Sequence, residues 1–259
     1  MRPPDFEARM RAGECFHDVR MLPAAWAVLR LDGHGFTRFT GRRYEKPFDA
    51  AFHDQMIAAA GRLLERFQGL YAYTESDEIS ILLPRGWDLF DRELEKAASL
   101  SASLAGSVFS IACGEPVQFD SRVWLGARDE DVVDYFRWRQ ADATRCALNG
   151  WSYWTLRKAG RNAAEATAAL HGKPVGFKHD LLRAHGIYFN DLPLWQRRGT
   201  GLYWERFAKE GFDPIRGVAV STIRRRLKVD RELPMKREYG LLVGRLMDGA
   251  GSGDSRRTA

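Results

Sequence analysis

The chain has few cysteines and no thiolate pattern of the kind that binds zinc. Its 259 residues include only Cys15, Cys113 and Cys146, and no C-x-x-C pair occurs. An odd number of widely spaced cysteines argues against a disulfide framework and favours a reducing compartment. The six histidines show no metal-ligand spacing either. We therefore expect neither a disulfide-rich secreted domain nor a zinc protein.

Long apolar segments are also missing from the sequence. No uninterrupted apolar run reaches about 18 residues, the length that indicates a membrane-spanning helix. The N-terminus, Arg2-Pro3-Pro4-Asp5, lacks the apolar region of a secretory signal. We find no internal repeat. These absences predict a cytoplasmic protein without a membrane partner.

The charge balance leans to the basic side. Lysine and arginine outnumber aspartate and glutamate by 40 to 34, which gives a net charge of +6. Such a balance suits a polyanionic partner, although a basic protein without one is equally compatible with it. With 45% hydrophobic residues, the chain can bury one full core, with or without a subdomain.

Two acidic turns carry the most information in the chain. Asp32 follows the apolar run 26–31, and Asp77 precedes the apolar run 79–83. Two carboxylates that converge at strand ends form a hard-oxygen site suited to Mg²⁺. Gly33 and Gly35 would let backbone N–H groups face a triphosphate. The alternative is that both segments are ordinary polar turns, because Asp-Gly is common in turns.

The apolar pattern of the first half predicts the order strand, helix, hairpin, helix, strand. This βαββαβ order is typical of an α/β ferredoxin-like sheet, the palm of many polymerases, and it places Asp32 and Asp77 on central strands. Fold alone does not imply that function. The expected elements are a strand at 26–31, a helix from Pro47 to Gly69 with Asp49 in its first turn, strands at 70–74 and 79–83, a helix at 88–105 and a strand at 107–112.

The second half reads as mostly helical with a late β-hairpin. Asn162 and Glu165 form a capping pair for one of its helices. We expect a core at 1–130 that contains the two acidic turns, a helical and hairpin part at 131–245 that completes the site, and a disordered tail at 249–259. The expected elements are helices at 130–148, 150–158 and 162–171, and strands at 200–207 and 217–223.

Six segments occur in an order that resembles the tRNA-His guanylyltransferase family. The resemblance extends from about residue 5 to about residue 230 and implies 3′-to-5′ nucleotide addition to the 5′ end of tRNA on a polymerase-palm fold. The segments are Asp32-Gly33-His34-Gly35-Phe36-Thr37-Arg38-Phe39, Lys46-Pro47-Phe48-Asp49, Ser76-Asp77-Glu78-Ile79-Ser80, Phe119-Asp120-Ser121-Arg122-Val123, Asp134-Tyr135 with Trp138-Arg139-Gln140-Ala141-Asp142, and Asn190-Asp191-Leu192-Pro193 before Arg198-Gly199-Thr200.

The resemblance implies two or more Mg²⁺ ions, with GTP and ATP as substrates. Asp32, the Gly33 carbonyl and Asp77 would hold the metal, and Asp32, Asp77 and Glu78 are the catalytic candidates. Alternation along a strand would point Glu78 to the other face, so its access to an ion stays open. The nucleotide-binding candidates are Asp32, Gly33, His34, Gly35, Phe36, Thr37, Lys46, Ser76 and Asp77.

The same resemblance assigns the helical half to tRNA and suggests a homotetramer. Trp138 could stack on a base or belong to the core, and the basic run at 224–228 could contact tRNA or form a solvated surface. The candidates for tRNA contact are Arg137, Arg139, Lys178, Arg197, Arg198, Arg224 and Arg226.

The chain also departs from the family pattern. Eukaryotic members continue after Asp142 with a His-Ile-Asn-Asn type run, whereas this chain has Thr144 and Ala147 where the His and one Asn stand. A repair-type enzyme, which rebuilds 5′ ends against the opposing strand, therefore fits at least as well as a tRNA-His-specific one. A palm-fold cyclase would have Gly-Gly where this chain has Glu75-Ser76, and an inactive RNA-binding homologue would lack the carboxylates.

Overall fold

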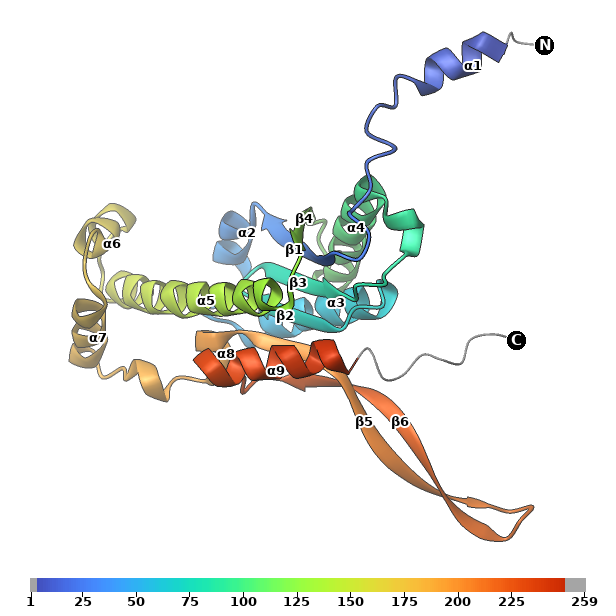
Figure 1. The fold of residues 1–259 in the computed structure, drawn as a ribbon. Helices are drawn as coiled ribbons and strands as arrows, with labels where there is room; N and C mark the ends of the chain where they lie inside the picture. Colours follow the sequence, from blue (N-terminus) through green and yellow to red (C-terminus); the bar gives the residue numbers. More distant parts are fainter. Residues whose placement is uncertain (1–3, 250–259) are drawn as a thin grey trace.

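One antiparallel sheet with the strand order β4-β1-β3-β2-β5-β6 organises the part of the chain that the computed structural model describes, residues 4–249 (Figure 1). Every neighbouring pair in this sheet is antiparallel. The strands are β1 (Trp26–His34), β2 (Tyr71–Glu75), β3 (Glu78–Leu83), β4 (Gln118–Gly126), β5 (Thr200–Asp213) and β6 (Val218–Asp230).

Some of the helices cover the two faces of this sheet, and others lie away from it (Figure 1). They are α1 (Pro4–Arg11), α2 (Phe36–Arg43), α3 (Ala50–Arg66), α4 (Leu94–Cys113), α5 (Asp129–Lys158), α6 (Ala163–Leu170), α7 (Val175–Ala184), α8 (Leu194–Arg198) and α9 (Lys236–Asp248), with short 3₁₀ turns η1 (Leu89–Arg92) and η2 (Phe189–Asp191). The sequence pattern predicted neither α2 nor α9.

The ferredoxin-like prediction is confirmed. The succession β1-α3-β2-β3-α4-β4 with the order β4-β1-β3-β2 is the βαββαβ arrangement. It places Asp32 of β1 directly opposite Glu78, the first residue of β3. The end of β1 and the β2–β3 turn therefore lie side by side.

Alternation along the strands separates two apolar layers. Leu29 and Leu31 of β1 belong to the cluster that α3 and α4 cover. Val28 belongs with Tyr71 and Tyr73 to the cluster beneath α5 and α9. Complete burial of a side chain such as Leu29 contributes about 1.5–3 kcal/mol. By the same alternation, Asp32 lies on the α5 side.

The prediction of a strand at 107–112 is wrong, because these residues form the last turns of α4. The buried positions of this helix recur every four residues, so one helical face packs on the sheet. The fourth ferredoxin strand is β4 instead, and it contains the motif that begins at Phe119. The buried residues that follow this spacing are Ala97, Ser101, Ala105, Phe109 and Cys113.

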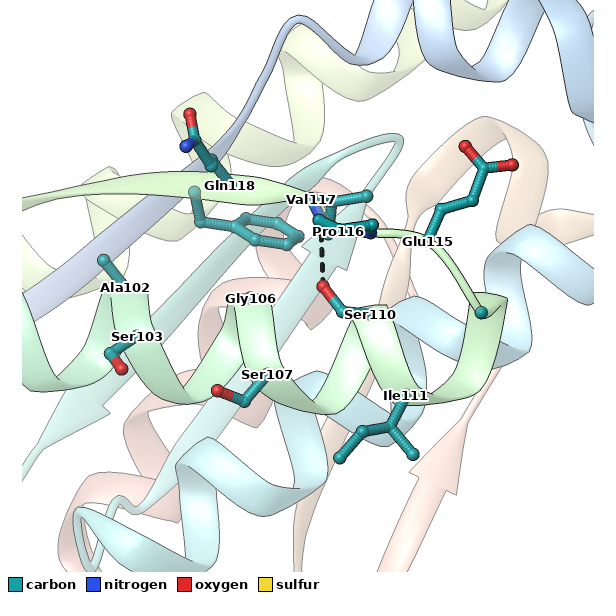
Figure 2. A pocket seen from close by; sticks show the side chains of 12 residues that line it. Ala102, Ser103, Gly106, Ser107, Ser110, Ile111, Glu115, Pro116, Val117 and Gln118 are labelled. Atoms are coloured by element: carbon teal, nitrogen blue, oxygen red, sulfur yellow. Dashed lines mark hydrogen bonds between the residues drawn. The ribbon is translucent and has the colours of Figure 1, made fainter.

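Among residues 4–249, α4 is the one helix whose length and apolar composition would allow it to cross a membrane. A helix that covers a sheet passes the same test, and α4 packs against α3 and β4. A hollow of about 720 Å³ lies beside it, between its outer face and residues 114–119 (Figure 2). Glu115 is the only ionisable residue in the lining, so this hollow offers little chemistry.

The second half is more continuous than predicted. The expected break at Gly150 is absent, because α5 runs without interruption to Lys158. The capping pair of α6 is confirmed, since Asn162 Oδ1 accepts from the Glu165 N–H at 3.0 Å and Glu165 Oε2 accepts from the Asn162 N–H at 2.9 Å.

The late hairpin is longer than predicted and joins the main sheet. Strand β5 pairs with β2 and extends to Asp213 rather than to residue 207, and β6 extends from Val218 to Asp230 rather than to residue 223. Its outer part projects from the body as an arm (Figure 1). Of the tail expected at 249–259, Gly249 caps α9, and the rest lies outside the described residues.

Candidate active site

The two acidic segments meet at the edge of the sheet. The Gly33 N–H donates to the Asp77 carbonyl oxygen at 3.1 Å, which ties the end of β1 to the β2–β3 turn. Burial raises the pKa of Asp77, the Asp32 carboxylate raises it further, and a 2.9 Å hydrogen bond from Ser76 Oγ opposes the rise. The two carboxylates are thus close enough to repel each other.

A row of four carboxylates crosses the sheet at this edge. The strand register pairs Asp120 with Asp32, Asp32 with Glu78, and Glu78 with Glu75. Residues paired directly across an antiparallel ladder share one face of the sheet. All four side chains therefore start from the α5 face, where like charges need cations to offset them.

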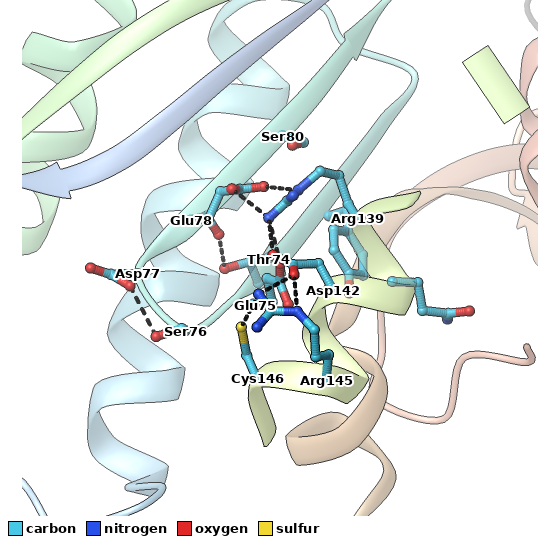
Figure 3. Close-up of polar contacts among 12 residues, drawn as sticks. Thr74, Glu75, Ser76, Asp77, Glu78, Ser80, Arg139, Asp142, Arg145 and Cys146 are labelled. Carbon is cyan, nitrogen blue, oxygen red and sulfur yellow. Dashed lines mark hydrogen bonds and ion pairs between the residues drawn. The ribbon is translucent and has the colours of Figure 1, made fainter. Parts of the chain in front are cut away.

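Arg139 of α5 supplies one of these cations (Figure 3). Its Nε donates to Glu78 Oε1 at 2.7 Å, and its Nη2 approaches Glu78 Oε2 at 2.8 Å and Glu75 Oε1 at 2.9 Å. Asp142 accepts from the same nitrogen at 3.2 Å. Asp77 lies on the other side of the turn, away from this group (Figure 3). The Glu78 carboxylate therefore faces Arg139.

Two carboxylates beside one guanidinium do not ionise equally. Burial and the neighbouring Glu78 raise the pKa of Glu75 to about 8, even though Arg139 lowers it. Burial also raises the pKa of Glu78, but two direct bonds from Arg139 oppose that rise. Near neutral pH the Glu75 carboxyl is therefore largely protonated, while Glu78 makes the two direct bonds to Arg139.

The residues at the edge fit a magnesium ion. Two carboxylates on adjacent segments match the way Mg²⁺ is bound, through one or two protein carboxylates together with water and substrate phosphates. The described residues contain no group of three or more His, Cys, Asp or Glu side chains that could hold a metal ion. A closed, all-protein metal cage is therefore not what this part of the chain offers.

A short helix, α2, begins four residues after Asp32. Gly35 precedes α2 with φ of +72°, a conformation that favours glycine, and makes no side-chain cap. The first N–H groups of α2 have no intrahelical acceptor, so they can bind a phosphate. A Cβ on Gly33 would lie 2.4 Å from the Phe36 ring, which explains the glycine there.

The predicted nucleotide-binding residues differ in whether their side chains are exposed. The Phe36 side chain is buried among Phe39, Phe109 and other rings, so only its backbone can face a nucleotide. His34, Gly35 and Thr37 are exposed. Lys46 donates from Nζ to Thr40 Oγ1, and burial lowers its pKa while Asp77 and Asp49 raise it.

The predicted RNA-binding residues separate into internal and exposed ones. Arg139 is 7% exposed. Its guanidinium binds carboxylates of the protein itself, and not the RNA phosphates that we expected. Arg197 and Arg198 donate to the backbone carbonyls of Leu192 and Leu233, each at 2.9 Å. These three side chains have structural partners within the protein.

The other candidates remain accessible. Arg137 pairs with Asp134 at 3.2 Å on the surface of α5, and Lys178 of α7 is partly exposed. The β5–β6 register places Arg224 and Arg226 on one face of the arm, where Arg226 donates to Glu205 at 2.7 Å. Contact of these residues with RNA stays a prediction.

Sequence reasoning missed two arginines. Arg30 lies opposite Arg122 of β4, one step inward from the acidic row. The Arg30 guanidinium is 5.6 Å from the ring of Trp138, which is 52% exposed and therefore not a core residue. The sequence held a signal for this pair, because each arginine stands two residues from an aspartate on a strand and so shares its face. The prediction of the fourth strand at 107–112 concealed that signal.

Comparison with known proteins agrees with this geometry. A family model described as tRNAHis guanylyltransferase matches residues 7–132, and one described as Thg1 C terminal domain matches residues 130–237. The chain belongs to the tRNA-His guanylyltransferase family. The prediction from the six segments is thereby confirmed.

Individual members of the tRNA-His guanylyltransferase family match over different lengths. The probable tRNA(His) guanylyltransferase of Dictyostelium discoideum is 34% identical over 196 residues, which are 71% of this chain and 77% of that protein. The tRNA(His) guanylyltransferase 1 of Arabidopsis thaliana is 32% identical over 207 residues, 74% of this chain. The chain covers only 36% and 37% of the two Arabidopsis relatives.

Solved structures within the tRNA-His guanylyltransferase family share the fold. A bacterial tRNA(His) guanylyltransferase-like protein in complex with ATP matches with a TM-score of 0.75 and 25% identity, over 93% of this chain and 99% of that one. The complex of such a protein with GTP matches with a TM-score of 0.70 and 26% identity, over 94% and 99%. The palm-like α/β assignment rests on both.

Proposed function

We propose that this chain is a magnesium-dependent nucleotidyltransferase that adds nucleotides to the 5′ end of tRNA in the 3′-to-5′ direction. The observation that carries the proposal is the junction of the two acidic segments, where the Gly33 N–H bonds to the Asp77 carbonyl and Asp32 stands beside the turn. Family membership supplies the reaction class. Because Asp32 and Asp77 are both present, the sequence favours an enzyme over an inactive RNA-binding protein.

Asp32, Asp77 and the Gly33 carbonyl are the groups that would hold magnesium. Bound there, the metal would neutralise phosphate charge and lower the pKa of a hydroxyl nucleophile. The first N–H groups of α2 and the Lys46 ammonium would bind the phosphates of a nucleotide. The bacterial relatives solved with GTP and with ATP support both nucleotides as substrates.

The proposed reaction has two balanced steps. An oxygen of the RNA 5′-phosphate attacks the α-phosphorus of ATP and expels pyrophosphate, which leaves an adenylylated 5′ end. The 3′-hydroxyl of GTP, or of another nucleotide paired with the template, then attacks the RNA 5′-phosphorus and expels AMP. The hydroxyl proton goes to solvent or to a nearby base, and the RNA gains one nucleotide with a triphosphate end.

We favour template-directed repair over strict tRNA-His recognition. Thr144 stands where eukaryotic members have His, and its hydroxyl donates to the Arg197 carbonyl oxygen at 2.8 Å. Ala147 stands where they have Asn, and it is buried in the cluster with Leu182 and Phe189. Both positions therefore have internal partners, so neither side chain would read an RNA.

We also propose a cytoplasmic homotetramer. The arm carries apolar side chains that a lone hairpin cannot bury, including Phe212, Ile215 and Ile223, which are 64%, 95% and 73% exposed. Three free cysteines are compatible with a reducing compartment. Light scattering on purified protein tests the assembly, and a monomer at micromolar concentration would reject it.

Labelled RNA with a 5′-monophosphate tests the activity. Full-length tRNA and tRNA that lacks its first nucleotide would each be incubated with ATP and one further nucleoside triphosphate. We expect an adenylylated intermediate and then a product one nucleotide longer, both dependent on Mg²⁺. No extension of any RNA with any nucleotide, by protein that is folded and binds RNA, would reject the proposed function.

A further inference from the structure

The segment that joins α2 to α3 contains Lys46 and is held at both of its ends. At the end of α2, Arg43 donates to the Glu115 carboxylate at 2.5 Å. At the start of α3, the Asp49 carboxylate caps the helix and also accepts from the Glu45 N–H at 3.0 Å. The backbone on either side of Lys46 is therefore fixed. The freedom that remains is that of its long, flexible side chain.

A single buried hydroxyl receives this side chain. Thr40 of α2 is 6% exposed, and its Oγ1 donates to the Phe36 carbonyl oxygen at 2.7 Å. Because a hydroxyl has only one proton to donate, the same oxygen must act as an acceptor towards Lys46, whose Nζ donates to it. Among the described residues Lys46 makes no second hydrogen bond, so two of the three donors of its ammonium are open to a ligand.

The ammonium lies near the proposed metal ligand and near the first turn of α2. Burial lowers the pKa of Lys46, whereas the Asp77 and Asp49 carboxylates raise it. Thr40 bonds to Phe36, the first residue of α2, whose first N–H groups would bind a phosphate. A phosphate bound between this helix end and the Asp77 turn would therefore lie within reach of the ammonium.

We propose that Thr40 is a positioning residue for nucleotide binding, because its hydroxyl holds the Lys46 ammonium where it meets the phosphate chain of a nucleoside triphosphate. The inference rests on the proposed function, since it explains how a group that this function uses is placed. Thr40 itself does not touch the nucleotide. The physical gain is preorganisation, because a lysine that is already fixed loses less conformational freedom when the phosphate binds.

A double-mutant cycle on nucleotide binding tests this role. Calorimetry without RNA, in EDTA and in Mg²⁺, would measure GTP and inorganic triphosphate as ligands. Thr40→Val keeps the shape of the side chain without its hydroxyl and should weaken both ligands by about 3- to 10-fold, the effect of one hydrogen bond. Lys46→Met should weaken them further, and Thr40→Val added to Lys46→Met should change the affinity by less than about twofold. Thr40→Ser should restore most of the affinity.

Two control variants match these changes. Ser152 of α5 is buried and donates to the carbonyl oxygen four residues earlier at 2.8 Å, the same kind of bond that Thr40 makes, so Ser152→Ala removes an equivalent hydroxyl. This serine lies about 20 Å along α5 from Arg139. Lys96→Met removes a lysine charge from α4, where it pairs with Glu93 at 2.8 Å. Both variants should bind GTP as the wild type does.

Non-additivity and rescue are results that a purely structural threonine would not give. If Thr40→Val weakens GTP by the same factor in the wild type and in Lys46→Met, or if Thr40→Ser restores nothing, the hydroxyl supports only the fold and the proposal is wrong. Unchanged affinity for both ligands in Thr40→Val would overturn it as well. Circular dichroism identifies an unfolded Thr40→Val, and Thr40→Ala then takes its place in the cycle.

The outcomes also separate this inference from the proposed function. A wild type that extends RNA normally, with Thr40→Val equal to it in affinity and rate, overturns the positioning role and leaves the function standing. A wild type that binds inorganic triphosphate through the Thr40–Lys46 pair, but never extends any RNA, overturns the function and keeps the positioning role.

Discussion

The Nε and Nη2 atoms of Arg139 donate to the two carboxylate oxygens of Glu78, at 2.7 and 2.8 Å, although the two residues are 61 positions apart in the sequence. This ion pair links α5 to β3, the strand that begins immediately after Asp77. The position of the β2–β3 turn, which carries Asp77, therefore depends on the helical half of the protein as well as on the sheet.

Arg139→Ala should destabilise the fold by about 3–5 kcal/mol, because it leaves buried Glu78 without its cation. The midpoint of urea unfolding at pH 7 measures this. Arg137→Ala is the matched control on the same helix, and its exposed ion pair should be worth at most about 1 kcal/mol. Equal effects of the two changes would contradict the assignment of Arg139 as an internal residue.

Asp77→Ala should lose nucleotide addition by several orders of magnitude while it remains folded, because the proposed metal loses one of its two carboxylates. Burial raises the pKa of Asp77, so its ionised form costs stability in protein without metal. The variant should therefore melt no lower than wild type in EDTA, and Mg²⁺ should stabilise only the wild type. Activity within tenfold of wild type would end the metal assignment.

His53 predicts a pH dependence of stability. Burial, followed by the Arg231 charge, lowers the pKa of His53 to about 4. Between pH 6.5 and 4 the unfolded chain therefore binds a proton that the folded protein does not, so stability falls as the pH falls through this window. The loss should be about 2–4 kcal/mol. The difference in unfolding free energy between wild type and His53→Gln, followed from pH 7 to pH 4, isolates this contribution, and a constant difference would exclude it.

The arm predicts a salt effect on RNA binding. Arg224 and Arg226 extend from one face of β6, so replacing both with alanine should reduce the slope of log K against log salt by about 1–2. Affinity for GTP should not change. Arg62→Ala with Arg66→Ala removes the same charge from α3 and should leave the slope as it is. An unchanged slope in the arm variant would make this run a solvated surface.

Template use distinguishes repair from tRNA-His-specific addition. On a tRNA that lacks its first 5′ nucleotide, changing the opposing base from C to A should switch the preferred substrate from GTP to UTP. The reason is that base pairing would select the nucleotide, while Thr144 and Ala147 have internal partners. Product length and identity on gels measure the switch. Addition of GTP at the same rate opposite A, and only on tRNA-His, would contradict repair.

The local signals in the sequence were sufficient for the first strand, the first hairpin and the capping pair of α6. They failed between residues 107 and 112, where Val108 and Ile111 resemble a strand although the four-residue spacing of buried positions continues the helix. The meeting of the Asp32 and Asp77 segments could be predicted because both carboxylates stand next to strong strands. The Arg139 cluster could not, since it depends on contacts between distant segments, and the Arg30–Arg122 pair was missed because the fourth strand was placed at the wrong residues.

The pairing of β2 with β5 has a consequence for dividing this protein. The two family models meet at residues 130–132, yet the ladder from Tyr71 to Thr74 is completed only by residues 200–203. A fragment that stops at the junction would present the β2 main chain as an open edge, ready to pair with another copy and aggregate. The two halves are therefore expected to need expression as one chain.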